Sequence, residues 1–224
     1  MANSRASRRE EPFRRRLSFA CLTVIFVGAI AVAACGGDES GSVDSARPAN
    51  GFPEWPAPDD PIERTTEAGL TPEVKEQLET HRHSHLDVFV DGEAVPVPAG
   101  IGIDITDPGV QHFPDNGAYG GIEECTNPCI SPLHTHDETG MIHTEAAADT
   151  LLTLGQFFTE WGVRLDDECV GEFCESETDI AVYIGGDEYE GDPADIELDD
   201  QLVIAIVIGT PPDQIPATAD FSQA

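Results

Sequence analysis

The clearest apolar pattern in the chain lies in residues 153–162, T-L-G-Q-F-F-T-E-W-G. Its large apolar side chains stand at positions i, i+3, i+4 and i+7, so they share one face of a helix: Leu154, Phe157, Phe158 and Trp161. Thr153 and Gln156 have the spacing of a capping box, and Gly162 suits the position just after a helix. The pattern predicts a helix over 154–161 that packs this face into a core.

A second, short helix is expected over residues 71–80. Thr71 is a good N-cap, and Pro72 suits the first helical position. Val74 and Leu78 stand four residues apart and would share its apolar face.

Alternating apolar and polar residues predict a first hairpin. Residues 85–90 alternate, with three apolar side chains on one face of the strand: Leu86, Val88 and Val90. Asp91 and Gly92 follow, a dipeptide typical of a two-residue hairpin turn. Pro96 and Pro98 mark the return as an edge strand, because proline cannot donate to a sheet ladder.

The second half of the chain predicts further strands. Residues 133–145 read as a hairpin with its turn at 137–140, D-E-T-G. Residues 180–184 form a strand that two glycines turn back. Residues 202–208, L-V-I-A-I-V-I, are apolar throughout, which is typical of a central strand buried on both faces.

These elements predict an α+β fold, a mixed β-sheet with one main amphipathic helix, in a single globular domain over 69–210. Residues 99–128 are rich in glycine, proline and aspartate and predict a loop. The strand–helix–hairpin–strand order of the C-terminal half is similar to a β-grasp arrangement. Residues 211–224 form a polar tail.

Residues 1–34 have the pattern of a bacterial lipoprotein signal peptide. Three arginines at 14–16 precede an apolar run that ends in V-A-A-C-G, which is similar to a lipobox with Cys35 as the lipidated residue. An uncleaved anchor helix is the alternative, since the run is about as long as a short membrane span. The R-R-x-L motif leaves both Sec and twin-arginine export open. The pattern predicts a protein held on the extracytoplasmic side of the cell membrane by a diacylglyceryl group on Cys35.

Residues 35–68 predict a disordered, acidic and proline-rich tether. The segment begins with a polar, low-complexity run, and its prolines recur from 48 to 61 without an apolar period. Trp55, inside F-P-E-W-P, is the one side chain here with a possible docking role on the domain.

The charge of the chain excludes one class of partner. The 224 residues carry 43 acidic and 11 basic side chains, a formal net charge of −32. Six of those bases and two of those acids lie in residues 1–34, so the remainder holds 41 acids against five bases, a charge of −36. Such a surface repels nucleic acid and anionic lipid. The acids are spread along the chain, which indicates solubility in a saline habitat rather than one cation site.

Six cysteines divide into three groups. Cys21 lies in the signal peptide and Cys35 takes the lipid. An even number of cysteines in an oxidising compartment predicts two disulfides, with three pairings open, among the remaining four: Cys125, Cys129, Cys169 and Cys174. A Cys/His zinc site is the alternative, because Cys129 stands five residues before His134.

Six of the seven histidines fall in two clusters. In the first cluster three histidines alternate along an expected strand, where residues two apart point to the same face: His81, His83 and His85. In the second cluster His134 and His136 alternate in the same way, and His143 returns across the expected hairpin to complete a three-histidine set. If the strand at 85–90 lies beside the hairpin at 133–145, both clusters face one site. His112 stands alone and is expected at the surface.

This ligand type predicts a transition-metal site, with zinc or copper(II) as the cofactor. Asp87, Asp137 and Glu145 alternate near the histidines, and each is a candidate further ligand or an acceptor for a ring N–H. Copper(I) is disfavoured because its carriers tend to be rich in methionine, and Met141 is the only methionine after the signal peptide. Calcium is disfavoured because the acidic residues lack EF-hand spacing.

Two other functions stay open beside metal binding. The first is a non-catalytic structural or interaction protein of the envelope, with a metal-free histidine network. The second is a His-ligated zinc hydrolase or lyase with Glu138 or Glu145 as general base. The chain lacks H-E-x-x-H, G-x-S-x-G and a phosphate loop, so no residue is assigned to catalysis or to an organic cofactor. No protein partner is predicted.

Several segments resemble an uncharacterised family of exported prokaryotic proteins and lipoproteins. They are H-x-H-x-H-L-D-V-F-V-D-G, P-A-G-I-G-I, L-H-T-H-D-x-T-G-x-I-H-x-E, T-L-G-Q-F-F-x-x-W-G and V-Y-I-G-G, within residues 81–209. The resemblance implies domain limits and export, and it implies no activity. Cys125, Cys169 and Cys174 depart from the common pattern, which leaves the disulfide pairing open.

Overall fold

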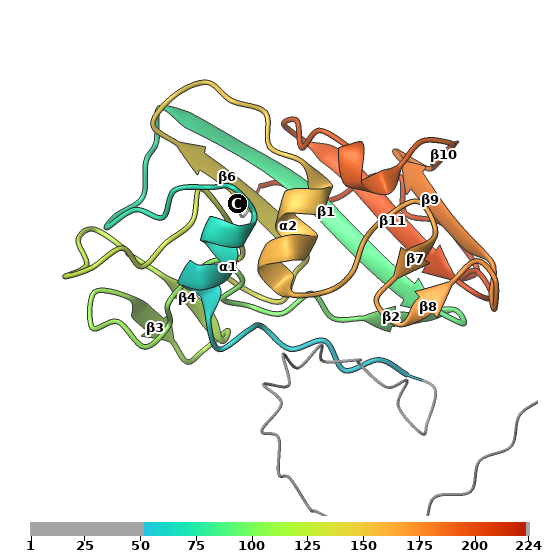
Figure 1. Cartoon of the computed structure of the whole chain (residues 1–224), viewed down its shortest axis with the longest axis horizontal. Helices are drawn as coiled ribbons and strands as arrows, with labels where there is room; N and C mark the ends of the chain where they lie inside the picture. The colour runs from blue at the N-terminus through green and yellow to red at the C-terminus, as the bar shows by residue number, and fades with distance from the viewer. Residues whose placement is uncertain (1–51, 223–224) are drawn as a thin grey trace, which may run out of the picture. The chain divides into compact units, whose positions relative to one another are not determined.

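A computed structural model describes residues 52–222 of the chain, and the signal peptide, Cys35 and residues 36–51 lie outside this part. Its centre is a seven-stranded mixed sheet in the order β10-β9-β11-β1-β6-β5, with β2 paired to β1 off this path (Figure 1). The strands are β1 (Thr80–Val90), β2 (Glu93–Val95), β5 (Leu133–His134), β6 (Met141–Ala146), β9 (Ile180–Ile184), β10 (Asp187–Tyr189) and β11 (Leu202–Ile208). The predicted α+β class is therefore confirmed.

The long strand β1 organises the sheet because it has three partners. One of its edges pairs in parallel with β11. The other edge pairs antiparallel first with β6, over Thr80–His85, and then with β2, over Val88–Val90. Asp91 and Gly92 have φ of 49° and 83°, which fits the predicted hairpin turn between β1 and β2. β11 is the predicted central strand, and residues 203–208 of it are all buried.

The predicted helix is α2 (Leu154–Trp161), and it packs on one face of the sheet. Its four apolar residues are at most 2% exposed: Leu154, Phe157, Phe158 and Trp161. The capping box is present, since Gln156 N donates to Thr153 Oγ1 at 3.3 Å and Thr153 N donates to Gln156 Oε1 at 3.0 Å. Gly162 ends the helix in the left-handed region with φ of 76°.

The prediction of a helix over 71–80 is wrong. Residues 73–76 run beside the 122–130 loop instead, and Cys129 N donates to Glu73 O while Cys125 N donates to Val74 O. These backbone partners replace the bonds that a helix would make. Leu78, expected on a buried face, is 62% exposed.

The first helix lies earlier in the chain, at α1 (Pro61–Glu67), where a tether was predicted. Gln156 of α2 donates from Nε2 to Ala68 O at 3.1 Å, just after α1 ends. Trp55 also packs on the domain, with its ring 5.8 Å from that of Trp161, whose Nε1 donates to Trp55 O. Residues 52–68 are thus part of the packed domain, because their apolar side chains cover the α2 side of the core.

The remaining elements are short. Two small hairpins are β3 (Gln111–Phe113) with β4 (Ala118–Gly120) and β7 (Cys169–Val170) with β8 (Phe173–Cys174), and a 3₁₀ turn is η1 (Pro193–Asp195). The predicted 99–128 loop is irregular except for β3 and β4. The β-grasp likeness stays a prediction. Among residues 52–222, no helix is long and apolar enough to cross a membrane.

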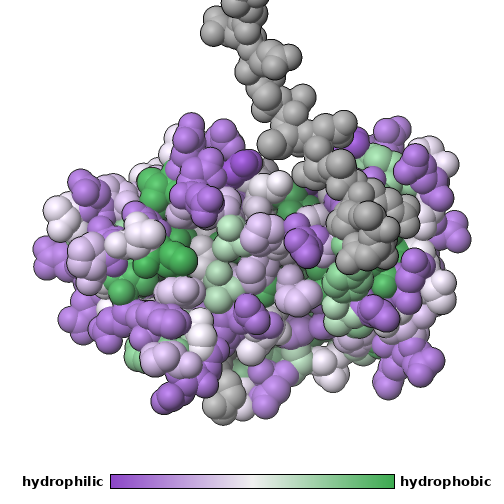
Figure 2. All heavy atoms as spheres, turned by 90° about the horizontal axis from the view of Figure 1, so that it is seen from below, coloured by the Kyte–Doolittle hydropathy of each residue, from purple (hydrophilic) through white to green (hydrophobic). Residues whose placement is uncertain are grey.

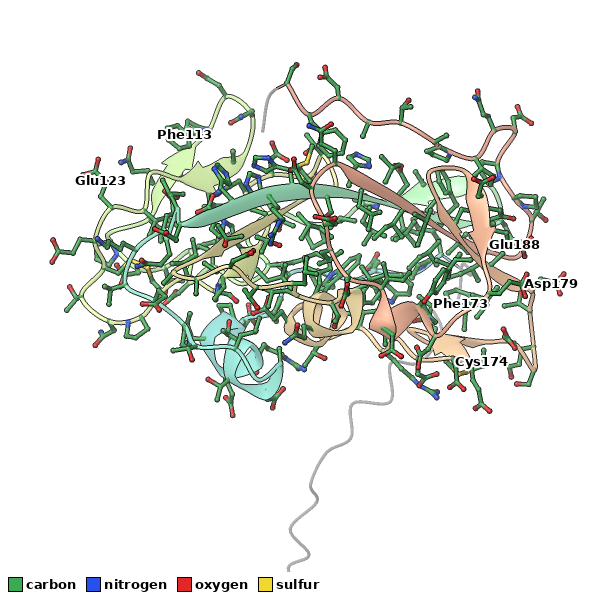
Figure 3. All side chains as sticks on the ribbon, turned by 90° about the horizontal axis from the view of Figure 1, so that it is seen from above. Phe113, Glu123, Phe173, Cys174, Asp179 and Glu188 are labelled. Atoms are coloured by element: carbon green, nitrogen blue, oxygen red, sulfur yellow. A yellow bond between two sulfur atoms is a disulfide. The ribbon has the colours of Figure 1, made fainter. Side chains whose placement is uncertain are left out.

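The tail after β11 crosses the sheet face opposite the helices (Figure 3). Pro216, Thr218, Ala219 and Asp220 line a pocket there together with side chains of β1 and β6. The sheet therefore lies between a helical layer and an irregular layer, and the histidines face the second. Figure 2 shows one side of the molecule, where hydrophilic residues predominate and hydrophobic ones gather in separate patches.

Candidate metal centre

Strand register brings the two histidine clusters together. Ser84 and Leu86 of β1 are buried on the helical side of the sheet, so the odd-numbered residues of β1 point to the opposite face. His83 pairs with His143 of β6, and His143 pairs with His134 of β5. Residues that face each other across antiparallel strands share a side of the sheet, so these three histidines form a row across three strands. The predicted contact between the clusters is present.

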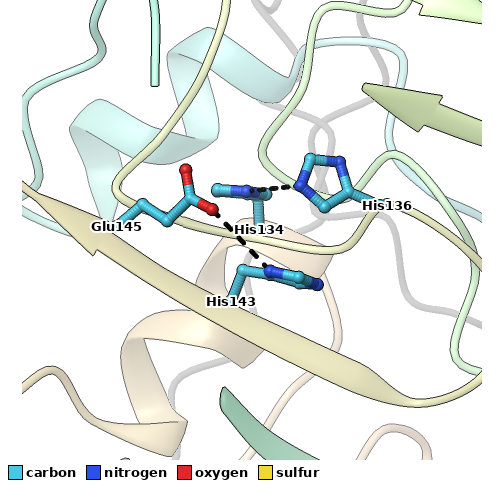
Figure 4. A group of neighbouring side chains, drawn as sticks. All are labelled: His134, His136, His143 and Glu145. Carbon is cyan, nitrogen blue, oxygen red and sulfur yellow. Dashed lines mark hydrogen bonds and ion pairs between the residues drawn. The ribbon is translucent and has the colours of Figure 1, made fainter. Parts of the chain in front are cut away.

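Four side chains form what we call the buried set: His134, His136, His143 and Glu145. Each offers one ligand atom, and these atoms lie within 4.8 Å of one another (Figure 4). His134 is 0% exposed, Glu145 5% and His143 8%, so the set is largely removed from solvent. Glu145 was one of the three acids predicted as a further ligand.

The hydrogen bonds of two histidines fix which nitrogen is free. His134 Nδ1 lies 2.9 Å from Ser131 O, and His136 Nδ1 lies 2.6 Å from Tyr119 O. A carbonyl oxygen only accepts, so both Nδ1 atoms carry the proton and donate. A neutral imidazole has one ring proton, which leaves a lone pair on each Nε2.

These two lone pairs converge. His134 Nε2 and His136 Nε2 are 3.2 Å apart. No hydrogen bond joins them while both rings are neutral, because neither Nε2 has a proton to donate. Burial lowers the pKa of both His134 and His136, and the neighbouring histidines lower it further, so both rings are held in the neutral form. The two Nε2 lone pairs therefore face each other with neither a proton nor a cation between them.

A metal ion fits this gap. Two imidazole nitrogens at 2.0–2.1 Å from a tetrahedral zinc ion are about 3.3–3.4 Å apart. The observed separation of 3.2 Å is close to this value. The Nδ1–H···O=C bonds supply the second contact that orients metal-binding histidines in proteins.

The other two members of the buried set carry orphaned atoms. His143 Nδ1 and Glu145 Oε2 are buried without hydrogen-bond partners. His143 Nδ1 is 3.8 Å from Glu145 Oε1, too far for a hydrogen bond. Burial lowers the pKa of His143 to about 4 and raises the pKa of Glu145, so burial opposes charge on both groups. Buried polar atoms without partners are rare, and here both face a place where a cation would satisfy them.

Three histidines form a second group that we call the outer set: His81, His83 and His143. Their ligand atoms also lie within 4.8 Å of one another. His83 Nε2 is buried and unpaired, and burial, followed by the neighbouring histidines, lowers its pKa to about 4. The predicted single site is thus two sets that share His143.

His85 belongs to neither set. Its Nδ1 lies 3.3 Å from Asp87 Oδ2, and hydrogen bonding to Asp87 raises the pKa of His85. His85 pairs with Met141, two residues beyond the His83–His143 pair, so it lies farther along β1. Asp137 accepts from Thr139 N and Thr139 Oγ1 and holds the turn before β6. These three predicted residues lie beside the centre without joining it.

A pocket of about 530 Å³ adjoins the centre on the tail side. His85, Asp87, Asp137, Met141 and His143 line it, together with four tail residues. His143 is the only ligand of the buried set among the lining residues. The pocket therefore borders the buried set at one residue, His143.

Both disulfides are present, as predicted, and each joins near neighbours. Cys125 is bonded to Cys129, and Cys169 to Cys174. The alternative Cys/His zinc site is wrong, because the sulfur of Cys129 is already bonded. Cys129 is followed at once by Ile130 and Ser131, so the first disulfide closes the loop that leads into His134.

Sequence reasoning missed the groups that orient the ligands. The carbonyls of Ser131 and Tyr119 carry no side-chain signature, and Tyr119 lies in a segment predicted as loop. Glu76 was also missed; its pKa is raised by burial and by nearby Glu145. His112, expected at the surface, is exposed and stacks on Tyr119 with ring centroids 4.9 Å apart.

Comparison with known proteins gives no further guidance. No family model matches the chain, and neither the curated proteins nor the solved structures contain a significant match.

Proposed function

We propose that the protein binds a divalent transition-metal ion, zinc or copper(II), through His134, His136, His143 and Glu145. The observation that carries the proposal is the pair of Nε2 lone pairs that face each other at 3.2 Å, with both Nδ1 atoms already donating to carbonyls. Three imidazoles and one carboxylate form a donor set that suits zinc and copper(II).

A metal-free histidine network accounts less well for this arrangement. Such a network is stable when each buried nitrogen and oxygen has a partner. Here the ring nitrogens of two histidines and one oxygen of Glu145 lack a hydrogen-bond partner: His83 Nε2, His143 Nδ1 and Glu145 Oε2. Leaving such groups unpaired costs about 1–3 kcal/mol each, so the network favours an added cation.

The proposed biological setting is the cell surface. The lipobox-like V-A-A-C-G segment supports a lipid anchor on Cys35 and a position outside the cytoplasm. The charge of −36 on residues 35–224 supports attraction of cations to the protein. The proposed role is metal capture or handling there.

Metal titration of the full-length protein, purified in detergent and stripped with a chelator, tests the proposal. We expect one tightly held zinc or copper(II) ion per chain, measured by calorimetry and elemental analysis. His136→Ala is expected to weaken binding at least about tenfold, because it removes one of four ligands. His112→Ala is the matched control, since that ring is exposed and outside both sets.

The titration also has a defined negative result. Dissociation constants weaker than micromolar for both metals in the wild-type protein would refute the proposal. So would a folded His136→Ala variant, checked by circular dichroism, that binds as tightly as the wild type.

A His-ligated zinc hydrolase or lyase is the second candidate. The pocket of about 530 Å³ that borders His143 favours it, because a substrate there would lie beside a metal ligand. Glu145 is itself in the ligand set, and Glu138 is exposed on the turn before β6, which weakens both as the general base. A panel of esters and phosphoesters, assayed with the zinc-loaded protein and with His136→Ala, separates an enzyme from a binding protein.

A further inference from the structure

The geometry points to His81 and His83 as an outer metal site that loads the buried one. We propose that a cation first binds His81, His83 and His143 and then passes to His134, His136 and Glu145, with His143 as a ligand throughout. The inference rests on the proposed function, since it assigns the route by which the buried set is filled.

The route begins at an exposed histidine and leads to buried ligands. The His81 side chain is 42% exposed, and the side chains of His143 and Glu145 are 10% and 5% exposed. His134, at the far end, is fully buried. A hydrated cation therefore meets His81 first, and it loses water as it moves inward.

The histidine rings follow one another at short spacings along this route. The ring centroids of His81 and His83 are 4.5 Å apart, and those of His83 and His143 are 4.6 Å apart. The next step, from His143 to His136, is again 4.5 Å between centroids. Such spacings allow one ligand to be exchanged for the next before the previous one is released.

Glu145 links the two sets as well. Its Oε1 lies 3.3 Å from His81 Nε2 and 3.8 Å from His143 Nδ1. A carboxylate in this position can hold the cation during the transfer, because it reaches a ligand of each set. Only a ligand exchange is involved: no bond of the protein breaks and no electron is transferred.

A direct path to the far side of the buried set is closed. The hollow between residues 73–77 and the pair His134 and Glu145 is too small for a water molecule. His136 is fixed from behind by its bond to Tyr119 O, and Gly120 lies against its ring. The outer set and the tail-side pocket both reach the centre through His143.

The two openings differ in what they offer a cation. The outer set adds two imidazoles to His143, a complete three-nitrogen site. Asp200 lies beside it, with its Oδ1 accepting from His83 N at 3.2 Å, and contributes negative charge at the mouth. In the pocket, His85 is held by Asp87, and His143 is the only ring of either set among the lining residues.

Metal-loading kinetics test this route in the full-length protein, with Co(II) as a spectroscopic probe for zinc. A site on the path, but outside the final ligand set, changes kon and koff by the same factor and leaves Kd unchanged. For the double variant His81→Ala/His83→Ala we expect both rates to fall about tenfold, since local concentration of a charged ligand changes on-rates by 10- to 1,000-fold. His81→Ala alone, at an exposed position, keeps the test usable if the double variant misfolds.

The controls distinguish the possible outcomes. His112→Ala lies outside both sets, and we expect it to load at the wild-type rate. Unchanged rates in the His81/His83 variants would overturn the proposed route, as would slow loading in His85→Ala alone, which would place the route in the pocket. A rise in koff with a matching loss of affinity would instead make His81 and His83 ligands of the final state. If the wild-type protein binds no metal, the proposed function itself is wrong.

Discussion

At the scale of single residues, the candidate centre depends on the tautomers of two histidines. Ser131 O and Tyr119 O hold the Nδ1 protons of His134 and His136, and this leaves both Nε2 atoms as acceptors. Either ring with the opposite tautomer would donate to the other and satisfy the pair without a metal. The chemistry of the site is thus set by two backbone carbonyls rather than by the histidines alone.

Glu160 is a buried group that supports the site indirectly, through Ser131. It lies on α2, is fully buried and accepts a hydrogen bond from the Ser131 hydroxyl. The same hydroxyl accepts from Leu133 N, one residue before His134. Glu160 therefore helps to position the loop that orients His134.

A pH-dependent stability follows from Glu160. Burial raises its pKa from 4.5 to about 8, so the folded state favours the neutral acid. Its stabilising contribution is complete below pH 4.5, and it is lost as pH rises through 8. Between these values the free energy of unfolding is expected to fall by about 1.4 kcal/mol per pH unit from this group.

Urea unfolding of the metal-free protein, compared with Glu160→Gln from pH 5 to pH 8, measures this contribution. The glutamine variant does not titrate, so its free energy of unfolding is expected to gain on that of the wild type as pH rises. Parallel pH profiles for the two proteins would show that Glu160 has an ordinary pKa.

At the scale of elements, the turn between β5 and β6 sets the register of the ligands. Gly140 has φ of 85°, and a Cβ there would lie 2.5 Å from Leu86 O of β1. This close approach lets the hairpin lie flat against β1, where Leu86 N donates to Gly140 O at 2.9 Å. Gly140 therefore holds His134 and His143 beside His83.

Gly140→Ala is expected to destabilise the protein and weaken metal binding, because both the left-handed backbone and the backbone clash must be relieved. Gly117→Ala is the matched control: its φ is 71°, but no atom lies within 4 Å of a Cβ there. We expect a cost of about 1–2 kcal/mol for Gly117→Ala from strain alone and a larger cost for Gly140→Ala. Equal melting temperatures for the two variants would contradict this account of the turn.

Local sequence patterns predict some elements well and others poorly. The helix 154–161 was predictable because its cap, its apolar face and its final glycine all lie within ten residues. The prediction of a helix over 71–80 failed because the backbone of residues 73–76 pairs with residues 122–130, about fifty positions away. α1 was missed because its seven residues show no apolar period, and its packing against α2 is a tertiary contact.

The candidate centre was likewise predictable only in part. Strand alternation and the predicted hairpin together placed His81, His83 and His143 near one site, and the structure confirms their proximity. His85 follows the same alternation, yet it lies apart because its partner across the sheet is Met141. The division into a buried and an outer set could not be predicted, since it depends on how β5, the 99–128 loop and the tail cover the face.

At the scale of the whole molecule, one face of the sheet forms the apolar core and the other face carries the candidate metal centre. α1 and α2 bury the apolar face of the sheet, while the opposite face carries the histidines under an irregular layer. The chain after the signal peptide is strongly acidic, with 41 acids against five bases in residues 35–224. In the proposed setting the lipid on Cys35 would hold this cation-attracting domain at the membrane, with the outer set as its route inward.

X-ray absorption spectroscopy of the zinc-loaded, full-length protein identifies the atoms that bind the metal. We expect one zinc per chain with about three imidazole nitrogens at about 2.0–2.1 Å and one carboxylate oxygen at about 2.0–2.2 Å. The His136→Ala variant is expected to lose one nitrogen from this shell. A shell of oxygen atoms alone, sulfur at about 2.3 Å, or a protein that retains no zinc would contradict the proposed ligand set.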